Sequence, residues 1–208
     1  MNKIFWIFLY LNLLLIGCTP QKEKPSSRGD ASILFELPET VVVNSDLQYN
    51  HKTSLFTLNH QAYSGYAVSY YPDGRLKEKF GVLHGKKQNQ FLQWYADGHL
   101  KSVSTYHQGR LHGAKNLWSA AAPHVLIAHF NYHTGKAHGA QTKWYPTGEL
   151  YKKLNLNQGK EEGMQRAYRK NGVLYANYEA RKGRIFGLKK AALCYGLEDE
   201  KVHYKRRQ

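Results

Sequence analysis

The histidines in the middle of the chain are the side chains best suited to chemistry. His124, His129, His133 and His138 lie close together in the sequence, and imidazole nitrogens are common zinc ligands. In a strand, residues four positions apart share a face, so His129 and His133 could meet one metal ion. A zinc site needs three or four converging ligands, however, and His138 matches His112 in a repeated turn sequence. The pattern favours hydrogen-bonded or exposed histidines, with metal binding as the alternative, and no metal or cofactor is predicted.

The neighbouring carboxylates of Glu161 and Glu162 are the second candidate, since such pairs can act as general acid and base. They occupy the positions that Leu111 and His112 fill in an equivalent segment, GKEEG against GRLHG. A turn is therefore the better interpretation. The sequence contains no phosphate-binding glycine loop, no nucleophilic serine motif and no CxxC pair. An enzyme is thus the least favoured of the function classes considered.

The N-terminal segment predicts an exported protein held by a lipid anchor. After Lys3 comes an apolar run, interrupted by one asparagine, that ends in LIGC at Cys18. It is shorter than the roughly 20 residues needed to span a bilayer but fits a signal peptide. LIGC resembles the bacterial lipobox, in which the cysteine is acylated and becomes the first residue after cleavage. The resemblance implies a signal peptide over 1–17, lipidation of Cys18 and a place in the bacterial cell envelope, on the outer-membrane, periplasmic or surface side. Cys194 then has no partner for a disulfide.

The segments on either side of the central region differ from it in composition. Residues 18–32 hold the lipidated cysteine and a stretch rich in Pro, Ser and charge, which predicts a flexible tether. Residues 33–46 are predicted as an N-terminal strand region and 197–208 as a basic C-terminal tail. The whole chain has 30 Lys and Arg against 15 Asp and Glu, a formal net charge of +15. This balance favours anionic partners such as acidic proteins or lipid head groups.

Glycines recur at a fixed spacing along the central region. Gly74 and Gly98 are 24 residues apart, Gly98 and Gly148 are 50 apart, and Gly148 and Gly172 are again 24 apart. The missing position falls in SAAAPHV, where one unit carries two extra residues. About six units therefore cover 47–196. Three parallel series give the predicted turn glycines: Gly74, Gly85, Gly98, Gly109, Gly113, Gly135, Gly139, Gly148, Gly159, Gly163, Gly172, Gly183 and Gly187.

The residues between the turns alternate between apolar and polar. Leu174 and Ala176 fall on one face of a strand, while Tyr175 and Asn177 fall on the other. Each unit has room for two strands of about 5 to 6 residues joined by tight glycine turns. We therefore predict an all-β fold, an elongated antiparallel β-meander of stacked 24-residue hairpins. The second strand of each unit ends in an aromatic residue, and these are expected to form a continuous row of rings: Tyr70, Trp94, Trp118, Trp144 and Tyr168.

These units carry a resemblance to a known repeat. YYPDGRLKEKFGVLHGKKQNQFLQWYADGHL resembles the MORN repeat variant, a YxxGxL segment followed by a GxxxG turn. A run of such units behind a lipobox is similar to bacterial proteins labelled YwqK-family antitoxins. The likeness covers roughly 47–196 and departs at 120–125 and in the first unit, where Asn50 and Gln61 replace glycine. It implies a protein that neutralises a toxin, and the signal peptide suits an immunity-like or envelope role.

Two function classes follow from these features. The first is a non-enzymatic binding protein that offers an aromatic and a basic face to a protein partner, either a toxin or an envelope protein, with no nucleic acid expected. The second is a membrane-surface or scaffold module whose lysines contact anionic head groups. The tryptophans could instead be purely structural. The candidate binding residues are Trp94, Trp118, Trp144, Lys77, Lys101 and Lys153.

The lipobox resemblance makes a direct prediction. Cys18→Ser should abolish palmitate labelling and release the protein from the membrane fraction, because the sequence contains no other apolar segment long enough to anchor it. Labelling followed by membrane fractionation measures both effects. Unchanged labelling of the variant would exclude Cys18 as the lipid attachment site.

Overall fold

The computed structural model describes residues 34–188, 195–198 and 201–204, which form β-strands joined by short turns. These residues contain no α-helix and one 3-10 turn, η1 (Asn44–Asp46). The predicted signal peptide, the Cys18 tether and Cys194 lie outside them. The strands are β1 (Val41–Val43), β2 (Gln48–Asn50), β3 (Leu55–Leu58), β4 (Gln61–Ala62), β5 (Gly65–Tyr70), β6 (Leu76–Leu83), β7 (Lys86–Trp94), β8 (Leu100–His107), β9 (Arg110–Trp118), β10 (Leu126–His133), β11 (Lys136–Trp144), β12 (Leu150–Asn157), β13 (Lys160–Glu161), β14 (Gly163–Tyr168), β15 (Leu174–Arg181), β16 (Arg184–Leu188), β17 (Tyr195–Glu198) and β18 (Lys201–Tyr204).

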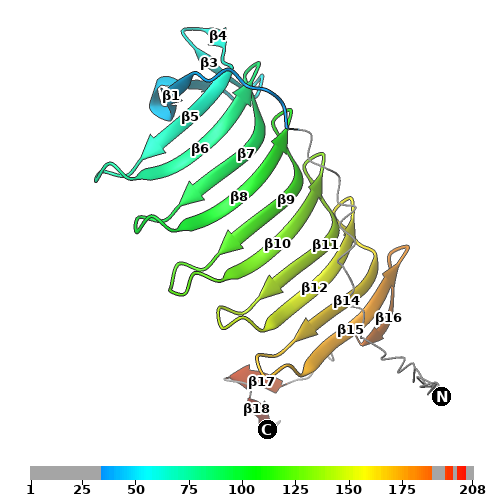
Figure 1. The fold of residues 1–208 in the computed structure, drawn as a ribbon. Coiled ribbons are helices and arrows are strands. Elements are labelled where there is room, and N and C mark those ends of the chain that lie inside the picture. Colours follow the sequence, from blue (N-terminus) through cyan, green and yellow to red (C-terminus); the bar gives the residue numbers. More distant parts are fainter. Residues whose placement is uncertain (1–33, 189–194, 199–200, 205–208) are drawn as a thin grey trace, which may run out of the picture. The chain divides into compact units, whose positions relative to one another are not determined.

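A single sheet of 13 strands contains most of the repeats. From β5 to β16 its strands follow the chain order, each antiparallel to the next, with the short β13 also paired to β12 (Figure 1). The predicted all-β meander of hairpins is confirmed. Its strands are longer than predicted, however, because β6 has 8 residues and β7 has 9. At the N-terminal edge β1 pairs in parallel with β5.

The first predicted unit does not join this meander as a regular hairpin. Its strands form a separate three-stranded sheet, β2-β3-β4. Asn50 lies in β2, where its side chain accepts a hydrogen bond from the Lys52 N–H, and Gln61 lies in β4. The turn is made by Asn59 and His60, whose φ angles are 49° and 67°. Asn50 and Gln61 stand where later units have glycine, but neither has the positive φ of those glycines. Asn50 ends β2, and the turn closes before Gln61.

The C-terminal boundary also differs from the prediction. Strand β17 contains Gly196, with which the predicted repeat region ends, and it pairs with β18. β18 lies inside the segment predicted as a basic tail. Together they form a two-stranded sheet of their own.

One set of turns uses two residues with positive φ. Between β8 and β9, Gln108 and Gly109 have φ of 48° and 80°, as a type I′ turn requires. The Gly109 N–H then donates to the Lys87 carbonyl of the preceding hairpin at 2.8 Å. The same bond recurs from Gly85, Gly135 and Gly159 to Tyr63, Leu111 and Ala137, respectively. These turns therefore connect neighbouring hairpins as well as neighbouring strands.

The turns at the opposite ends of the strands have three-residue loops. In the loop after β7, the Tyr95 N–H donates to the His99 carbonyl at 2.8 Å and the Gly98 N–H donates to the Tyr95 carbonyl at 2.9 Å. Gly98 has a φ of 90°, which suits a type I turn followed by a left-handed residue. Gly74, Gly148 and Gly172 lie in the matching turns.

The tyrosine that begins such a loop also joins neighbouring hairpins. The Tyr71 hydroxyl donates to the Trp94 carbonyl at 2.7 Å, and the Tyr95 hydroxyl donates to the Trp118 carbonyl at 2.9 Å. The Tyr145 hydroxyl makes the equivalent bond to the Tyr168 carbonyl at 3.0 Å. The carbonyls of Trp94, Trp118 and Tyr168, which each end a second strand, are thus satisfied from the preceding unit.

The second glycine of each predicted GxxxG turn lies within a strand and not in the turn. The structure places Gly113 in β9 and Gly139 in β11, at φ of 87° and 78°. Gly163 and Gly187 occupy the same position in β14 and β16. Strand register shifts beside this position, as between Phe130 and Tyr132. The predicted GxxxG turn is therefore a two-residue turn followed by a β-bulge, since a bulge also accepts a left-handed residue.

Buried glutamines compensate for these irregularities. The Gln141 amide donates to the Asn131 carbonyl at 2.9 Å, and Gln165 donates to the Asn155 carbonyl at 2.7 Å. Both amides also lie within hydrogen-bond distance of carbonyls near the bulge glycine of their own strand. Because a bulge interrupts strand pairing, a buried amide that satisfies the freed carbonyls removes a penalty of about 1–3 kcal/mol.

The tyrosine hydroxyl bonds lead to a prediction on stability. Tyr71→Phe and Tyr95→Phe should each lower the free energy of unfolding by about 1 kcal/mol, because each leaves a carbonyl without its partner. Tyr70→Phe is the matched control, since Tyr70 is 51% exposed. Urea unfolding monitored by circular dichroism measures the differences. Equal effects at Tyr70 and Tyr95 would contradict a role of these bonds in joining the hairpins.

Candidate binding surface

The strand register defines two faces of the large sheet. Face A contains the paired row Ala67, Phe80, Phe91, Ser104, Lys115, Phe130, Gln141 and Leu154. Face B contains the adjacent row Val68, Lys79, Leu92, Val103, Asn116, His129, Thr142, Lys153 and Arg166. Most of the buried side chains belong to face A, including Ala67 and Phe80 in the hydrophobic cluster beside β3. The segment before β1 lies on face B at β6–β8, where Phe35 stacks on His107 and Leu37 lies against Gly81. Beyond β8, face B offers more side chains to a partner than face A does.

The three lysines predicted for binding are all exposed. Lys77 and Lys101 occupy equivalent positions, and their ammonium groups lie 5.8 and 5.7 Å from the ring centres of Tyr71 and Tyr95. Lys153 pairs with Thr142 and Arg166 nearer the middle of its strand. The three therefore do not share one repeat position, and the structure does not bring them together in a single row.

The predicted continuous row of aromatic rings is not formed. Trp94, Trp118 and Trp144 are half-buried, and no ring contact between them occurs in the described part of the chain. Equivalent residues of successive hairpins are two strands apart, about 9.5 Å. Aromatic pairs need ring centres within about 7 Å. The prediction was wrong for this reason, and the tryptophans are linked to their neighbours through their backbone carbonyls.

A row of cations on face B was missed by the sequence reasoning. In the large sheet, each two-residue turn with glycine at its second position is followed at once by a lysine or arginine, and all of these are exposed: Lys86, Arg110, Lys136, Lys160 and Arg184. We call this set the cationic row. The ion pairs between described residues involve none of its members. With neighbours about 9.5 Å apart, the row extends for about 38 Å. The recurring GK or GR after the turn is the signal that could have revealed it.

Histidines lie beside the cationic row. His107 and His133 are directly paired with Arg110 and Lys136. Their rings lie in a series with that of His112. The ring centres of His107 and His112 are 5.8 Å apart, and those of His112 and His133 are 4.8 Å apart. His138 follows at 5.9 Å from His133. This edge of face B therefore combines the charges of the cationic row with a series of imidazole rings.

Of the four histidines considered as metal ligands, the other two, His124 and His129, lie apart from this series of rings. His129 Nδ1 is 2.7 Å from the Asn116 side-chain oxygen. His124 stacks on His99, with ring centres 3.6 Å apart. Among the described residues, one group of side chains that could hold a metal ion does come together. It consists of Asp97, His99 and His124.

Lys87 lies among aromatic rings on face A. Its ammonium group is 4.4 Å from the ring centre of Phe91 and 4.7 Å from that of Phe80, with Phe56 and Tyr106 at 5.7 and 5.5 Å. Burial among these rings lowers the pKa of Lys87, and the charge of Glu78 partly opposes this shift. The rings come from β3, β6, β7 and β8, so the sequence alone gave no sign of this arrangement.

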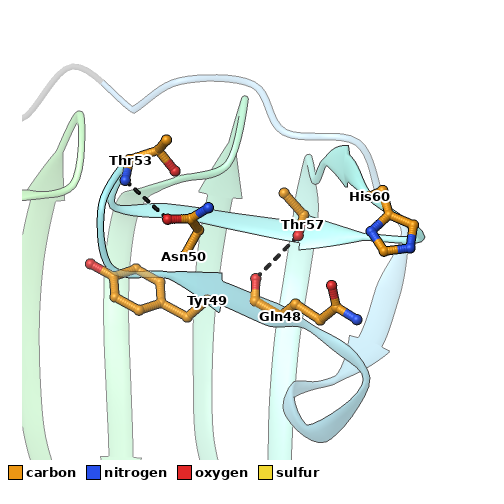
Figure 2. Close-up of a pocket in the computed structure, with 6 residues that line it drawn as sticks. All are labelled: Gln48, Tyr49, Asn50, Thr53, Thr57 and His60. Atoms are coloured by element: carbon orange, nitrogen blue, oxygen red, sulfur yellow. Dashed lines mark hydrogen bonds between the residues drawn. The ribbon is translucent and has the colours of Figure 1, made fainter.

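Two hollows adjoin this region. One of about 570 Å³ is lined by Lys86, Lys87 and Arg110 together with Tyr49, Phe56 and Tyr106, among others. Figure 2 shows the second, of about 370 Å³, beside β2 and β3. Its polar groups are two threonine hydroxyls, two side-chain amides, a tyrosine and His60. The second hollow is thus lined by uncharged polar side chains and a histidine, whereas the first is lined by cations and aromatic rings.

The paired carboxylates occupy different surroundings. Glu161 lies in β13 and accepts a hydrogen bond from the Tyr178 hydroxyl at 2.8 Å. Burial and this bond raise the pKa of Tyr178 to about 12. Glu162 follows the strand, and its N–H donates to the Asn155 carbonyl. Glu161 therefore has a structural partner within the sheet.

Comparison with known proteins gives no assignment: no family model matches the chain, and a search of curated proteins returns no match. Within the described residues, no helix is long and apolar enough to cross a membrane.

The environment of Lys87 predicts a pH-dependent contribution to stability. Its folded-state pKa lies below that of the unfolded chain, so the unfolded chain binds more protons between the two values. The wild-type protein should therefore gain stability relative to Lys87→Met as the pH rises from 7 towards about 10.5. Thermal unfolding of both proteins across this range measures the difference. Lys86→Met, at an exposed neighbour, serves as the control. A pH-independent difference for Lys87→Met would contradict its burial as a charged group.

Proposed function

We propose that this protein is a non-enzymatic binding protein of the bacterial cell envelope that holds an acidic segment of a partner protein against face B. The cationic row is the observation that carries the proposal. Its exposed cations repeat at one position of successive hairpins and are not neutralised by ion pairs with described residues. Acylation of Cys18 would hold the array at a membrane, as its lipobox-like sequence implies.

An extended acidic segment matches the geometry of this row. The cations repeat about every 9.5 Å, which corresponds to nearly three residues of an extended chain. A segment of about 12 residues would therefore span the row, with carboxylates meeting successive cations. The histidines beside Arg110 and Lys136 would offer further hydrogen-bond donors to such a segment.

The resemblance to MORN-variant proteins labelled as antitoxins suggests one such partner. An acidic toxin bound along face B would be held in the envelope and kept from its target. An acidic envelope protein would be bound by the same surface, in which case the protein acts as a scaffold. Both are partners of the same chemical class.

The alternative is binding to anionic phospholipid. Exposed lysines contribute roughly 1 kcal/mol each near an anionic membrane surface. The cationic row favours the protein partner, because its regular single-file spacing matches an extended acidic segment. A lipid-anchored array also needs no second membrane contact to remain bound.

Two triple variants with the same charge change test the proposal. Arg110→Glu, Lys136→Glu and Lys160→Glu alter the row, whereas Lys77→Glu, Lys101→Glu and Lys153→Glu alter exposed lysines outside it. Fluorescence anisotropy with a labelled glutamate-rich peptide of about 12 residues measures binding at several salt concentrations. The row variant should bind at least about tenfold more weakly, which is about 1.4 kcal/mol, and the second variant should lose much less.

Equal losses in both variants would show that net charge alone attracts the peptide and would contradict the proposed site. Sedimentation with vesicles of phosphatidylglycerol and phosphatidylcholine tests the alternative. If the row variant loses more of its binding to vesicles than of its binding to the peptide, the membrane-surface function is favoured.

A further inference from the structure

We propose that Asp97, His99 and His124 form a binding site for a divalent transition-metal ion, with Zn²⁺ as the best match. One ligand atom from each of these three side chains lies within 4.8 Å of the other two. His99 Nδ1 is 3.3 Å from Asp97 Oδ1, and the two imidazole rings lie nearly parallel, with an interplanar angle of 13°. The site is distinct from the cationic row and does not depend on the proposed function.

The distances suit a shared ion after small side-chain movements. Zinc binds histidine nitrogen and carboxylate oxygen at about 2.0–2.2 Å, so ligand atoms of a tetrahedral site lie about 3.3–3.6 Å apart. A closure of roughly 1 Å brings the present separations into this range. Asp97 and His99 are exposed and His124 is half-buried, so no packed core surrounds these side chains. The stacked rings of His99 and His124 must turn from face to edge for both to reach one ion. Water would complete the coordination.

Backbone hydrogen bonds hold the two loops that supply the ligands. Asp97 Oδ1 accepts a bond from the His99 N–H at 3.0 Å, which fixes both residues in the loop between β7 and β8. In the loop between β9 and β10, the Ser119 N–H donates to the Val125 carbonyl at 2.9 Å. His124 Nδ1 lies 3.3 Å from the Ser119 carbonyl. A contact of this kind orients the ring of a metal-binding histidine through its second nitrogen.

The equivalent positions of other units do not hold the same set of possible metal ligands. In the preceding unit, the positions of Asp97 and His99 hold Asp73 and Arg75, which form an ion pair at 2.6 Å. In a later unit they hold Thr147 and Glu149. The histidine pair thus occurs where the following loop is lengthened by two residues and contributes His124. The lengthened loop places a third ligand beside a loop that already has two.

The donor set indicates the class of ion. Two imidazole nitrogens and one carboxylate oxygen match the ligands of zinc sites that retain an open position, whereas Mg²⁺ and Ca²⁺ prefer oxygen ligands alone. Ni²⁺ and Cu²⁺ also bind imidazole, so availability would decide among these ions. Because the ligands come from two consecutive hairpins, a bound ion would link the hairpins across the irregular unit.

The test uses the chain without its signal peptide and with Cys18→Ser, titrated with Zn²⁺ in a calorimeter and with Co²⁺ in a spectrophotometer. One equivalent should bind tightly, and Co²⁺ should give the visible absorption of a low-coordinate site. His99→Ala and His124→Ala should each weaken Zn²⁺ binding at least tenfold. Asp97→Asn should do so as well, although asparagine can still accept the His99 N–H bond, so the turn is preserved.

Two further measurements separate this site from other histidines and from misfolding. His60→Ala removes a histidine outside the group and should leave binding unchanged. Zn²⁺ should raise the melting temperature of the parent protein but not of His124→Ala, while the two melt alike without metal. Binding that survives in His124→Ala or Asp97→Asn, or that is lost equally in His60→Ala, would overturn the proposed site.

Discussion

The structure depends on one recurring hydrogen bond between consecutive hairpins. The N–H of the turn glycine donates to a carbonyl of the hairpin before it, as Gly109 does to Lys87 and Gly135 does to Leu111. For the N–H to point at that carbonyl, the turn must hold two residues in the left-handed region, which explains the glycine at the second position. Strand pairing sets the spacing of successive hairpins, and this bond holds their turns in line. A residue placed after the turn is repeated one hairpin further on at the same height.

This constraint explains how a thin sheet can be stable while much of its surface stays exposed. In a repeat array each unit contacts only its neighbours, so much of the surface remains outside a globular core. The hydrophobic cluster around Phe80 lies where β3 meets the large sheet, and further along the buried positions include polar residues such as Gln141 and Gln165. Those amides satisfy backbone carbonyls at the bulges, so stability there rests on hydrogen bonding as well as on apolar burial.

The sequence predicted the fold more completely than the binding surface, for identifiable reasons. Glycine spacing and apolar alternation report on local backbone geometry, and both led to the all-β meander. The strand lengths were underestimated because Gly113 and Gly139 were assigned to turns, whereas a left-handed residue also fits a bulge within a strand. Which side chains meet depends on distances across strands. The tryptophans recur in register but lie too far apart to touch, and the rings around Lys87 come from separate strands.

The two ends of each hairpin differ in how freely they can vary, and this difference accounts for where the candidate sites lie. At the two-residue turns, backbone bonds between hairpins fix the geometry, so only side chains can change, and the cationic row occurs there. At the opposite ends, the link between units is a side-chain bond from tyrosine, as in Tyr71 and Tyr95. Ser119 stands where this tyrosine would be, and the loop that it begins is the one with two extra residues. Loss of the tyrosine link therefore coincides with the longer loop, which carries His124 to the side of His99. A regular array can thus acquire a local site without disturbing the hydrogen bonds that align its strands.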